Sequence, residues 1–212
     1  MAKIQSGATA DELTIDAASK AARVTLYDVN GIAVNSNAAP ASYRSTSGVM
    51  SLGTLASNSC FLALNNPVGS GKNLYIVRAN IVLAMVGNTA NTIVPLGMVR
   101  GTGTPAGGTG NKSGANIARR NPADAASIAQ FYYGPAAITG LTDDAAGDVR
   151  SVMITNQNPA LFEMELLGDI PHKEYFSDAT IVPPGYSWCI RNRATSNAGS
   201  TIAVNLEWIE AA

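Results

Sequence analysis

The chain has 212 residues, of which 46% are hydrophobic and 14% are charged, and its formal net charge is −1. This length fits one large domain with an arm or two small domains, and the apolar fraction is sufficient for a core. The near-neutral charge argues against broad electrostatic attraction to nucleic acid or membranes, and no apolar run approaches the roughly 20 residues that span a bilayer.

Residues 1–48 are predicted to form an N-terminal arm and linker. Up to about residue 22 the side chains are small and polar, so this stretch cannot bury enough surface to fold alone. We expect it to become ordered against neighbouring proteins. Polar residues also interrupt any apolar signal core, so the chain is expected to stay in the cytoplasm after synthesis. The residues predicted to contact a partner are Ile4, Leu13, Ile15 and Arg23.

A short hairpin is predicted within the arm. Val24–Val29 and Ile32–Val34 are strand-like, and Asn30-Gly31 between them favours a tight turn because both residues tolerate a positive φ. The polar, proline-containing stretch 35–48 is the expected linker to the body.

The body, residues 49–212, reads as a series of short strands separated by turn residues. The clearest is Ile202–Trp208, where apolar and polar residues alternate and predict one buried and one exposed face. The apolar run 74–86 is rich in β-branched residues and predicts a long, bulged central strand. Pro95 assigns the strand 92–100 to a sheet edge or a bulge. Further strands are predicted at 60–64, 128–133, 152–155, 161–167, 180–182 and 187–191.

A long Gly-, Thr- and Asn-rich stretch, residues 101–122, is predicted to be a loop. Loops of this length inside compact domains are usually functional or contact a partner. Its candidate contact residues are Lys112, Arg119 and Arg120.

Eight or more short strands without a convincing long helix predict an all-β fold, an antiparallel β-sandwich or jelly roll. No repeat of 20 to 50 residues is detectable, which disfavours a propeller or solenoid.

Two motifs with a chemical interpretation are better explained as turns. Gly69-Ser70-Gly71-Lys72 lacks the spacing and the following helix of a phosphate-binding loop, so it predicts a hairpin turn. Asp143, Asp144 and Asp148 could donate oxygens to calcium, but the alternation of the helix-loop-helix calcium motif is missing. An acidic turn around Gly147 is the favoured interpretation.

Glu163 and Glu165 lie on one strand face about 7 Å apart, a separation compatible with glycoside hydrolysis. Because the residues between and around them form an apolar face, the simpler interpretation is a solvent-facing side. His172 is the only histidine, and no nucleophile-elbow pattern accompanies it. We therefore expect no enzymatic activity, no catalytic residues and no cofactor.

Cys60 and Cys189 lie in apolar strands and are expected to be buried free thiols rather than a disulfide. No cysteine–histidine spacing predicts a zinc site. Aromatic side chains are favoured at interfaces, so four tyrosines could line a carbohydrate site or a subunit seam. They are Tyr132, Tyr133, Tyr175 and Tyr186.

Three stretches resemble small virion structural proteins of tailed bacteriophages. They are SGATADELTIDAASKAARVTLYDVNG (residues 6–31), NPVGSGKNLYI (residues 66–76), and PPGYSWCI (residues 183–190) with the closing strand that ends at Trp208-Ile209-Glu210. The resemblance implies a jelly-roll body, commonly a homotrimer, mounted on a capsid or tail by its N-terminal part. It does not distinguish capsid decoration from attachment to a tail or fibre.

Three functions follow as hypotheses. The first is a capsid decoration or cement protein of the virion, whose partners are further copies of itself and the major capsid protein or tail and baseplate proteins. The low charged fraction fits a surface partly covered by other chains. The second is a tail- or fibre-associated module that binds a host glycan or receptor through the 101–122 loop and the tyrosines. The third is a glycosidase based on Glu163 and Glu165.

Overall fold

The computed structural model describes residues 14–15, 22–23, 26–27, 33–34, 41–52, 55–85, 93–155, 162–167, 180–194 and 200–211. By their contacts the residues divide into two units, Met1–Ala39 and Pro40–Ala212. The described residues contain no helix, and hence none that is long and apolar enough to cross a membrane.

The N-terminal unit contains two short antiparallel pairs. β1 (Thr14–Ile15) pairs with β2 (Ala22–Arg23), and β3 (Leu26–Tyr27) pairs with β4 (Ala33–Val34). The second pair lies where a hairpin is predicted. Its register places Tyr27 opposite Ala33, and the predicted turn at Asn30-Gly31 lies outside the described residues.

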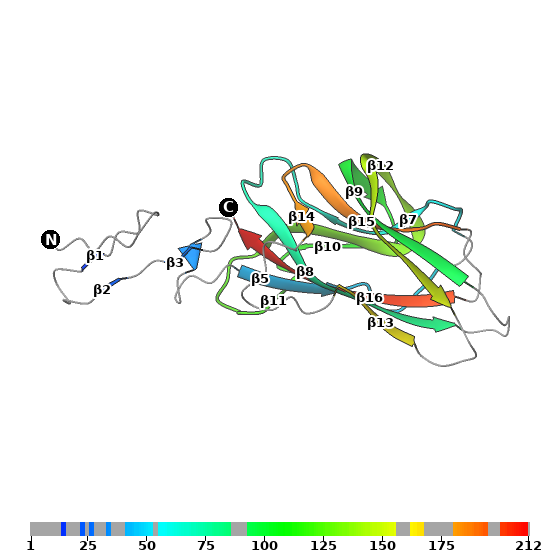
Figure 1. The fold of residues 1–212 in the computed structure, drawn as a ribbon, viewed down its shortest axis with the longest axis horizontal. Helices are drawn as coiled ribbons and strands as arrows, with labels where there is room; N and C mark the ends of the chain where they lie inside the picture. Colours follow the sequence, from blue (N-terminus) through cyan, green and yellow to red (C-terminus); the bar gives the residue numbers. More distant parts are fainter. Residues whose placement is uncertain are drawn as a thin grey trace. The chain divides into compact units, whose positions relative to one another are not determined.

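The second unit is built from two antiparallel sheets that form two layers (Figure 1). One sheet has the strand order β11-β5-β16-β8-β13, with β14 also paired to β8 and β6 to β16; the other has the order β10-β12-β7-β15-β9. The predicted all-β fold with antiparallel sheets is confirmed and is consistent with a β-sandwich. The strands are β5 (Ala41–Thr46), β6 (Met50–Ser51), β7 (Cys60–Asn65), β8 (Asn73–Met85), β9 (Ile93–Gly107), β10 (Gly110–Gly114), β11 (Ala118–Arg119), β12 (Ser127–Thr155), β13 (Phe162–Leu167), β14 (Thr180–Val182), β15 (Tyr186–Asn192) and β16 (Ser200–Ala211).

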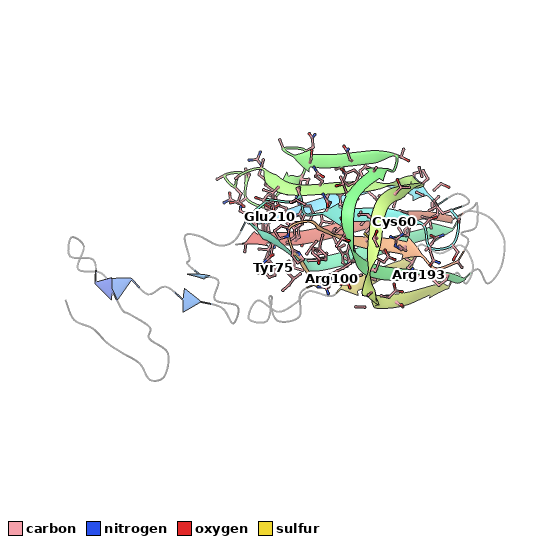
Figure 2. All side chains as sticks on the ribbon, turned by 90° about the horizontal axis from the view of Figure 1, so that it is seen from above. Cys60, Tyr75, Arg100, Arg193 and Glu210 are labelled. Atoms are coloured by element: carbon pink, nitrogen blue, oxygen red, sulfur yellow. The ribbon has the colours of Figure 1, made fainter. Side chains whose placement is uncertain are left out.

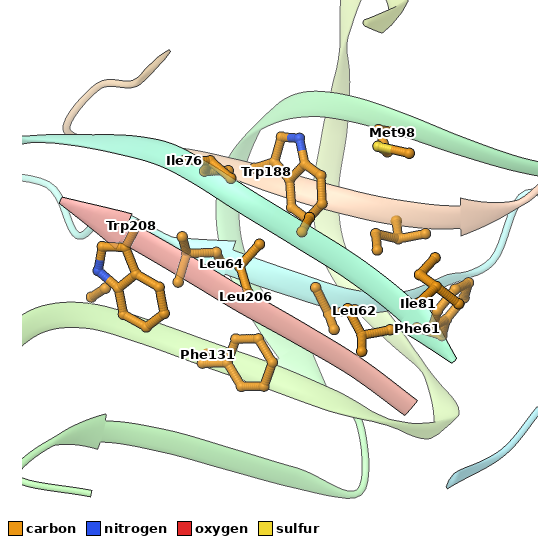
Figure 3. Close-up of a cluster of buried hydrophobic side chains, with 14 of the residues drawn as sticks. Phe61, Leu62, Leu64, Ile76, Ile81, Met98, Phe131, Trp188, Leu206 and Trp208 are labelled. Atoms are coloured by element: carbon orange, nitrogen blue, oxygen red, sulfur yellow. The ribbon is translucent and has the colours of Figure 1, made fainter. Parts of the chain in front are cut away.

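The main core lies between the two sheets and includes both tryptophans (Figure 3). Trp188 of β15 and Trp208 of β16 are 1% and 0% exposed, and Tyr43 of β5 stacks on Trp208 with ring centroids 6.1 Å apart. The alternation in β16 is confirmed, because its apolar positions are buried and the intervening positions are half-buried or exposed. The buried positions are Ile202, Val204, Leu206 and Trp208.

β12 turns the second sheet into a partly closed structure. It pairs with β7 through its first part and with β9 through its later part, while β15 pairs with both β7 and β9. These four strands therefore pair in a closed cycle, which encloses a second, smaller apolar cluster. Its buried members are Cys60, Ala63, Val99, Ile138 and Cys189. Because β7 contacts a core on each face, all of its residues are buried, and its sequence is an apolar run that does not alternate.

β8 contains the bulge that its sequence predicts. Glu207 of β16 lies opposite Arg78, but the next residue, Trp208, lies opposite Ile76, so Val77 is an extra residue in β8. A bulge of this kind reverses which alternate positions face the core. It therefore allows Ile76 and Ala79 to be buried on the same strand.

The predicted linker is wrong over part of its length. Residues 41–46 form β5, which pairs with β16 on one side and β11 on the other. The contact division accordingly lies after Ala39 instead of after Gly48. Tyr43 and Ser45 are buried while Arg44 and Thr46 are exposed, so β5 does alternate. Tyr43 is the only large apolar residue of β5, so the alternation is not evident from the sequence.

The predicted 101–122 loop is also wrong. β9 continues to Gly107, and β10 and β11 occupy much of the remainder. Glycine makes this possible where β9 and β12 approach closely, because a Cβ atom on Gly103 would overlap the carbonyl oxygen of Gly140. Gly103 also has a φ of 110°, which favours glycine.

Two further strand predictions need correction. The predicted strands 128–133 and 152–155 are the two ends of one strand, β12, whose middle is held by β9. β9 is not an edge strand, because it pairs with both β12 and β15. Pro95 is tolerated because the ladder with β15 ends at Leu96, so no N–H is required of it on that side.

Candidate functional site

The candidate site is an open groove of about 400 Å³ that lies over the neighbouring strands β5, β16 and β8. Residues of β5, β8 and β16 line it, together with residues from β10 to β11. We call it the cationic groove, because three of its lining side chains are positively charged. They are Arg44 of β5, Arg78 of β8 and Lys112 of β10.

The strand register assembles the charged row of the groove. Glu207 of β16 lies opposite Arg44 on one side and opposite Arg78 on the other. Neighbouring side chains across an antiparallel sheet lie within interaction distance, so two cations flank one carboxylate. Within the part of the chain that the structure describes, neither Arg44 nor Glu207 forms an ion pair. Both charges therefore remain available to a ligand.

A polar row runs beside the charged one. Asn205 of β16 lies opposite Thr46 of β5 and Asn80 of β8, and all three line the groove. Asn116, from the turn between β10 and β11, adds a third amide to the lining. Amides and hydroxyls both donate and accept hydrogen bonds, so this surface suits a polyhydroxylated ligand.

Lys112 is held in place at the groove. Its Nζ donates a hydrogen bond to the Thr46 carbonyl oxygen at 2.6 Å and lies 5.3 Å from the centre of the Tyr133 ring. The carbonyl and the ring face both stabilise a cation. Of the three predicted loop contacts, the structure brings only Lys112 into the groove lining.

The other two predicted loop contacts have different surroundings. The Arg119 guanidinium donates to the carbonyl oxygens of Pro122 at 3.4 Å and Asp124 at 2.7 Å, so it braces the segment after β11. Arg120 is exposed, and its backbone N–H donates to Ser42 at 2.9 Å. Ile15 and Arg23 lie in β1 and β2, whereas Ile4 and Leu13 lie outside the described residues.

The acidic cluster is neutralised by arginine. Arg191 pairs with Asp143, and Arg100 Nη2 lies 3.5 Å from Asp144 Oδ2. Asp148 pairs with Arg193. The β12–β9 register shifts between Asp143 and Asp148, where the intervening residues leave the ladder. The acidic turn around Gly147 is thus the better description, and these carboxylates hold the irregular part of β12 against β9 and β15.

Glu210 of β16 is a buried carboxylate, 3% exposed, that links the two sheets. Its Oε1 accepts hydrogen bonds from the Ser127 hydroxyl at 2.5 Å, the Ile128 N–H at 3.1 Å and the Trp208 indole at 3.3 Å. Ser127 begins β12, so the carboxylate connects β16 to the opposite sheet. Glu210 and Arg193 lie toward opposite ends of the body (Figure 2).

Two buried acidic side chains, Tyr43 and Cys189, have raised pKa values. Burial, followed by the negative charge of Glu210, raises the pKa of Tyr43 to about 12. The pKa of Cys189 is raised well above its ordinary value by a hydrogen bond with Cys60 and by burial. Both cysteines are free and buried, as predicted, and the thiols are therefore poor nucleophiles.

The described tyrosines do not gather in one cluster. Tyr132 packs against the smaller cluster, whereas Tyr133 and Tyr186 pack against the main core. Tyr175 lies outside the described residues, as does His172. Glu163 and Glu165 lie in β13, paired with Val82 and Asn80 of β8.

The Gly69–Lys72 segment is a turn, as predicted, but not a hairpin turn. Gly69 and Gly71 have φ values of 78° and 69°, and the Ser70 N–H donates to Pro67 at 3.2 Å. The two strands that it connects, β7 and β8, belong to different sheets.

Most of the residues that line the groove were not among the predicted site residues. Arg78 and Asn80 interrupt an apolar strand, and Asn205 and Glu207 occupy the polar positions of β16. Polar residues at alternate positions mark an outward face, so they were a usable signal. The pairing of β5 with β16 was required to add Arg44.

Among the described residues, no group of three or more His, Cys, Asp or Glu side chains is placed to hold a metal ion. No family model matches the chain, and no curated protein and no solved structure matches it either.

Proposed function

We propose that this chain is a non-enzymatic structural protein of a tailed-bacteriophage virion, made in the host cytoplasm and acting as a capsid decoration or cement protein. In this proposal the body is a jelly roll that associates into a homotrimer. The arm, including Leu13 and Ile15, attaches the trimer to the major capsid protein or to tail and baseplate proteins.

The strand order is the observation that supports the proposal most. Let the main strands be numbered one to eight in chain order, with β13 and β14 sharing the sixth place beside β8. One sheet then has the order 1-8-3-6. The other has the order 5-2-7-4, and strand 5 (β12) also pairs with strand 4 (β9), so the neighbours 2-7-4-5 occur within a closed cycle. A jelly roll built from interleaved Greek keys is expected to bring the same strands together, and this architecture is common in viral capsid proteins, so the strand order supports the proposed body. The sequence resemblance to phage virion proteins supports the same assignment.

The use of polar groups in the body supports a structural role. Glu210 joins the sheets, Asp143 and Asp148 pair with arginines, and Asn192 donates hydrogen bonds to the carbonyl oxygens of Leu55 at 3.2 Å and Ala56 at 2.8 Å. These four polar side chains are thus engaged in holding strands and loops together. A rigid body on an arm suits multivalent attachment, in which several modest contacts combine into tight anchoring.

The proposal is tested by counting this protein in purified particles of the phage that encodes it. Quantitative mass spectrometry, referenced to the major capsid protein, gives the number of copies per particle. Hundreds of copies support capsid decoration, and a few copies support the tail. Absence of the protein from purified particles would overturn the proposal.

A second candidate function is a tail- or fibre-associated module that binds a glycan or receptor. Jelly rolls also form lectin domains, and the cationic groove is the observation that favours this function. The groove replaces the 101–122 loop and the tyrosines as its candidate site, because the loop is largely strand and the described tyrosines lie in two separate clusters.

A further inference from the structure

We propose that the cationic groove binds an acidic oligosaccharide, one that carries carboxylate groups on a chain of sugar hydroxyls. This inference rests on the second candidate function alone and assigns its ligand class and residues. It does not depend on where the protein is located in a particle.

The charge of the groove selects for a negative ligand. Arg44, Arg78 and Lys112 line it with one carboxylate, Glu207, on a chain whose formal net charge is −1. Arg78 already takes part in another interaction, so Arg44 and Lys112 are the cations offered to a ligand. Arg44 is exposed and forms no ion pair within the described part of the chain, so its guanidinium can bind a carboxylate without breaking an existing contact. Lys112 is fixed by Thr46 and Tyr133, so little side-chain entropy is lost when it binds.

The remaining lining distinguishes a sugar from a simple anion. Glu207 lies between Arg44 and Arg78 and would repel a phosphate or sulfate ion. A sugar hydroxyl, in contrast, can donate a hydrogen bond to this carboxylate while a sugar carboxylate pairs with Arg44. The amides of Asn80, Asn116 and Asn205 supply further donors and acceptors.

Size and shape also fit. A volume of about 400 Å³ lies within the range of small-ligand sites, which is roughly 300 to 1,000 Å³. The groove lies on the outer face of the sheet, where Arg44, Asn116 and Asn205 are exposed. An open groove of this kind can accept one section of a longer polysaccharide chain.

The test uses the full-length protein and trigalacturonic acid as the probe, with calorimetry as the measurement. We expect saturable binding that weakens as salt is added, and binding at least tenfold weaker for the methyl-esterified trisaccharide, which keeps its sugar hydroxyls but loses the charges. Arg44→Ala and Lys112→Met should each weaken binding at least fivefold. Arg120→Ala removes an exposed cation outside the groove lining and should leave binding unchanged.

Four binding results would overturn the assignment. They are no binding of the trisaccharide, equal binding of its methyl ester, displacement by an equal concentration of inorganic phosphate, and displacement by penta-aspartate. The last would identify the groove as a site for acidic protein segments.

Unfolding midpoints of the variants verify that they are folded, and Arg44→Ala protein should join particles as the wild type does. If it failed to join, the groove would be a particle contact and not a glycan site.

Discussion

At the scale of single residues, buried polar groups determine how the two sheets are joined. Glu210 accepts hydrogen bonds from a hydroxyl, an indole and a backbone N–H, so it satisfies donors from both sheets at once. A buried donor that loses its acceptor costs about 1–3 kcal/mol. The stability of this end of the sandwich therefore depends on one carboxylate.

Glu210→Gln is expected to lower the free energy of unfolding by about 1–3 kcal/mol. The amide NH₂ group would replace a carboxylate oxygen that accepts a hydrogen bond, so two donors would face each other. Urea denaturation measures the change. Glu207→Gln is the matched control, since it makes the same substitution on the half-buried outer face of β16. That control should alter stability by no more than about 0.5 kcal/mol. Equal effects of the two substitutions would contradict the role given to Glu210.

Tyr43 supplies a prediction for alkaline pH. Its pKa is raised from 10.0 to about 12, mainly by burial, so the neutral phenol is favoured in the folded state. The associated stability is present below pH 10 and is lost as the pH rises towards about 12. Each pKa unit corresponds to about 1.4 kcal/mol, so the loss is about 3 kcal/mol. Denaturation at a series of pH values measures it, and Tyr43→Phe should remove this part of the pH dependence.

Gly97 is required by a neighbouring ion pair. A Cβ atom at this position would overlap Arg193 Nε and lie within 2.8 Å of Asp148 Cγ. Gly97→Ala should therefore destabilise the protein by about 1–3 kcal/mol. In an Asp148→Ala background the same substitution should destabilise the protein less, because removal of the Asp148 carboxyl group leaves room for the new Cβ atom. A double-mutant cycle measures this coupling, and strictly additive effects would show that the crowding is unimportant.

At the scale of elements, strands marked by an apolar or alternating sequence were predictable and strands held mainly by their partners were not. β14 was predicted with its observed bounds, and β16 through its buried apolar face. β5 and the 101–122 segment were missed, because their strand structure depends on hydrogen bonds to β16 and β12 more than on side-chain pattern. The groove was missed for the same reason, since only the register brings Arg44, Arg78 and Glu207 together.

The alternation of β16 has a direct test. Leu206 is 0% exposed and Asn205 is exposed, although the two residues are adjacent. Leu206→Ala should cost about 2–5 kcal/mol through lost burial and the cavity left behind. Asn205→Ala should change stability by no more than about 0.5 kcal/mol. Similar losses at both positions, measured by chemical denaturation, would contradict a strand with one buried and one exposed face.

At the scale of the whole molecule, we propose that folding and attachment belong to different parts of the chain. The two described sheets and their shared core belong to the unit Pro40–Ala212, and Met1–Ala39 forms a separate contact unit. In the proposed function, the larger unit folds and associates by itself while the first 22 residues bind the particle.

The most direct measurement is a comparison of particle incorporation by the full-length chain and by a chain lacking residues 1–22. The account predicts that the truncated protein keeps its oligomeric state and unfolding midpoint but is absent from purified particles. Undiminished incorporation of the truncated chain would contradict the proposed division between folding and attachment.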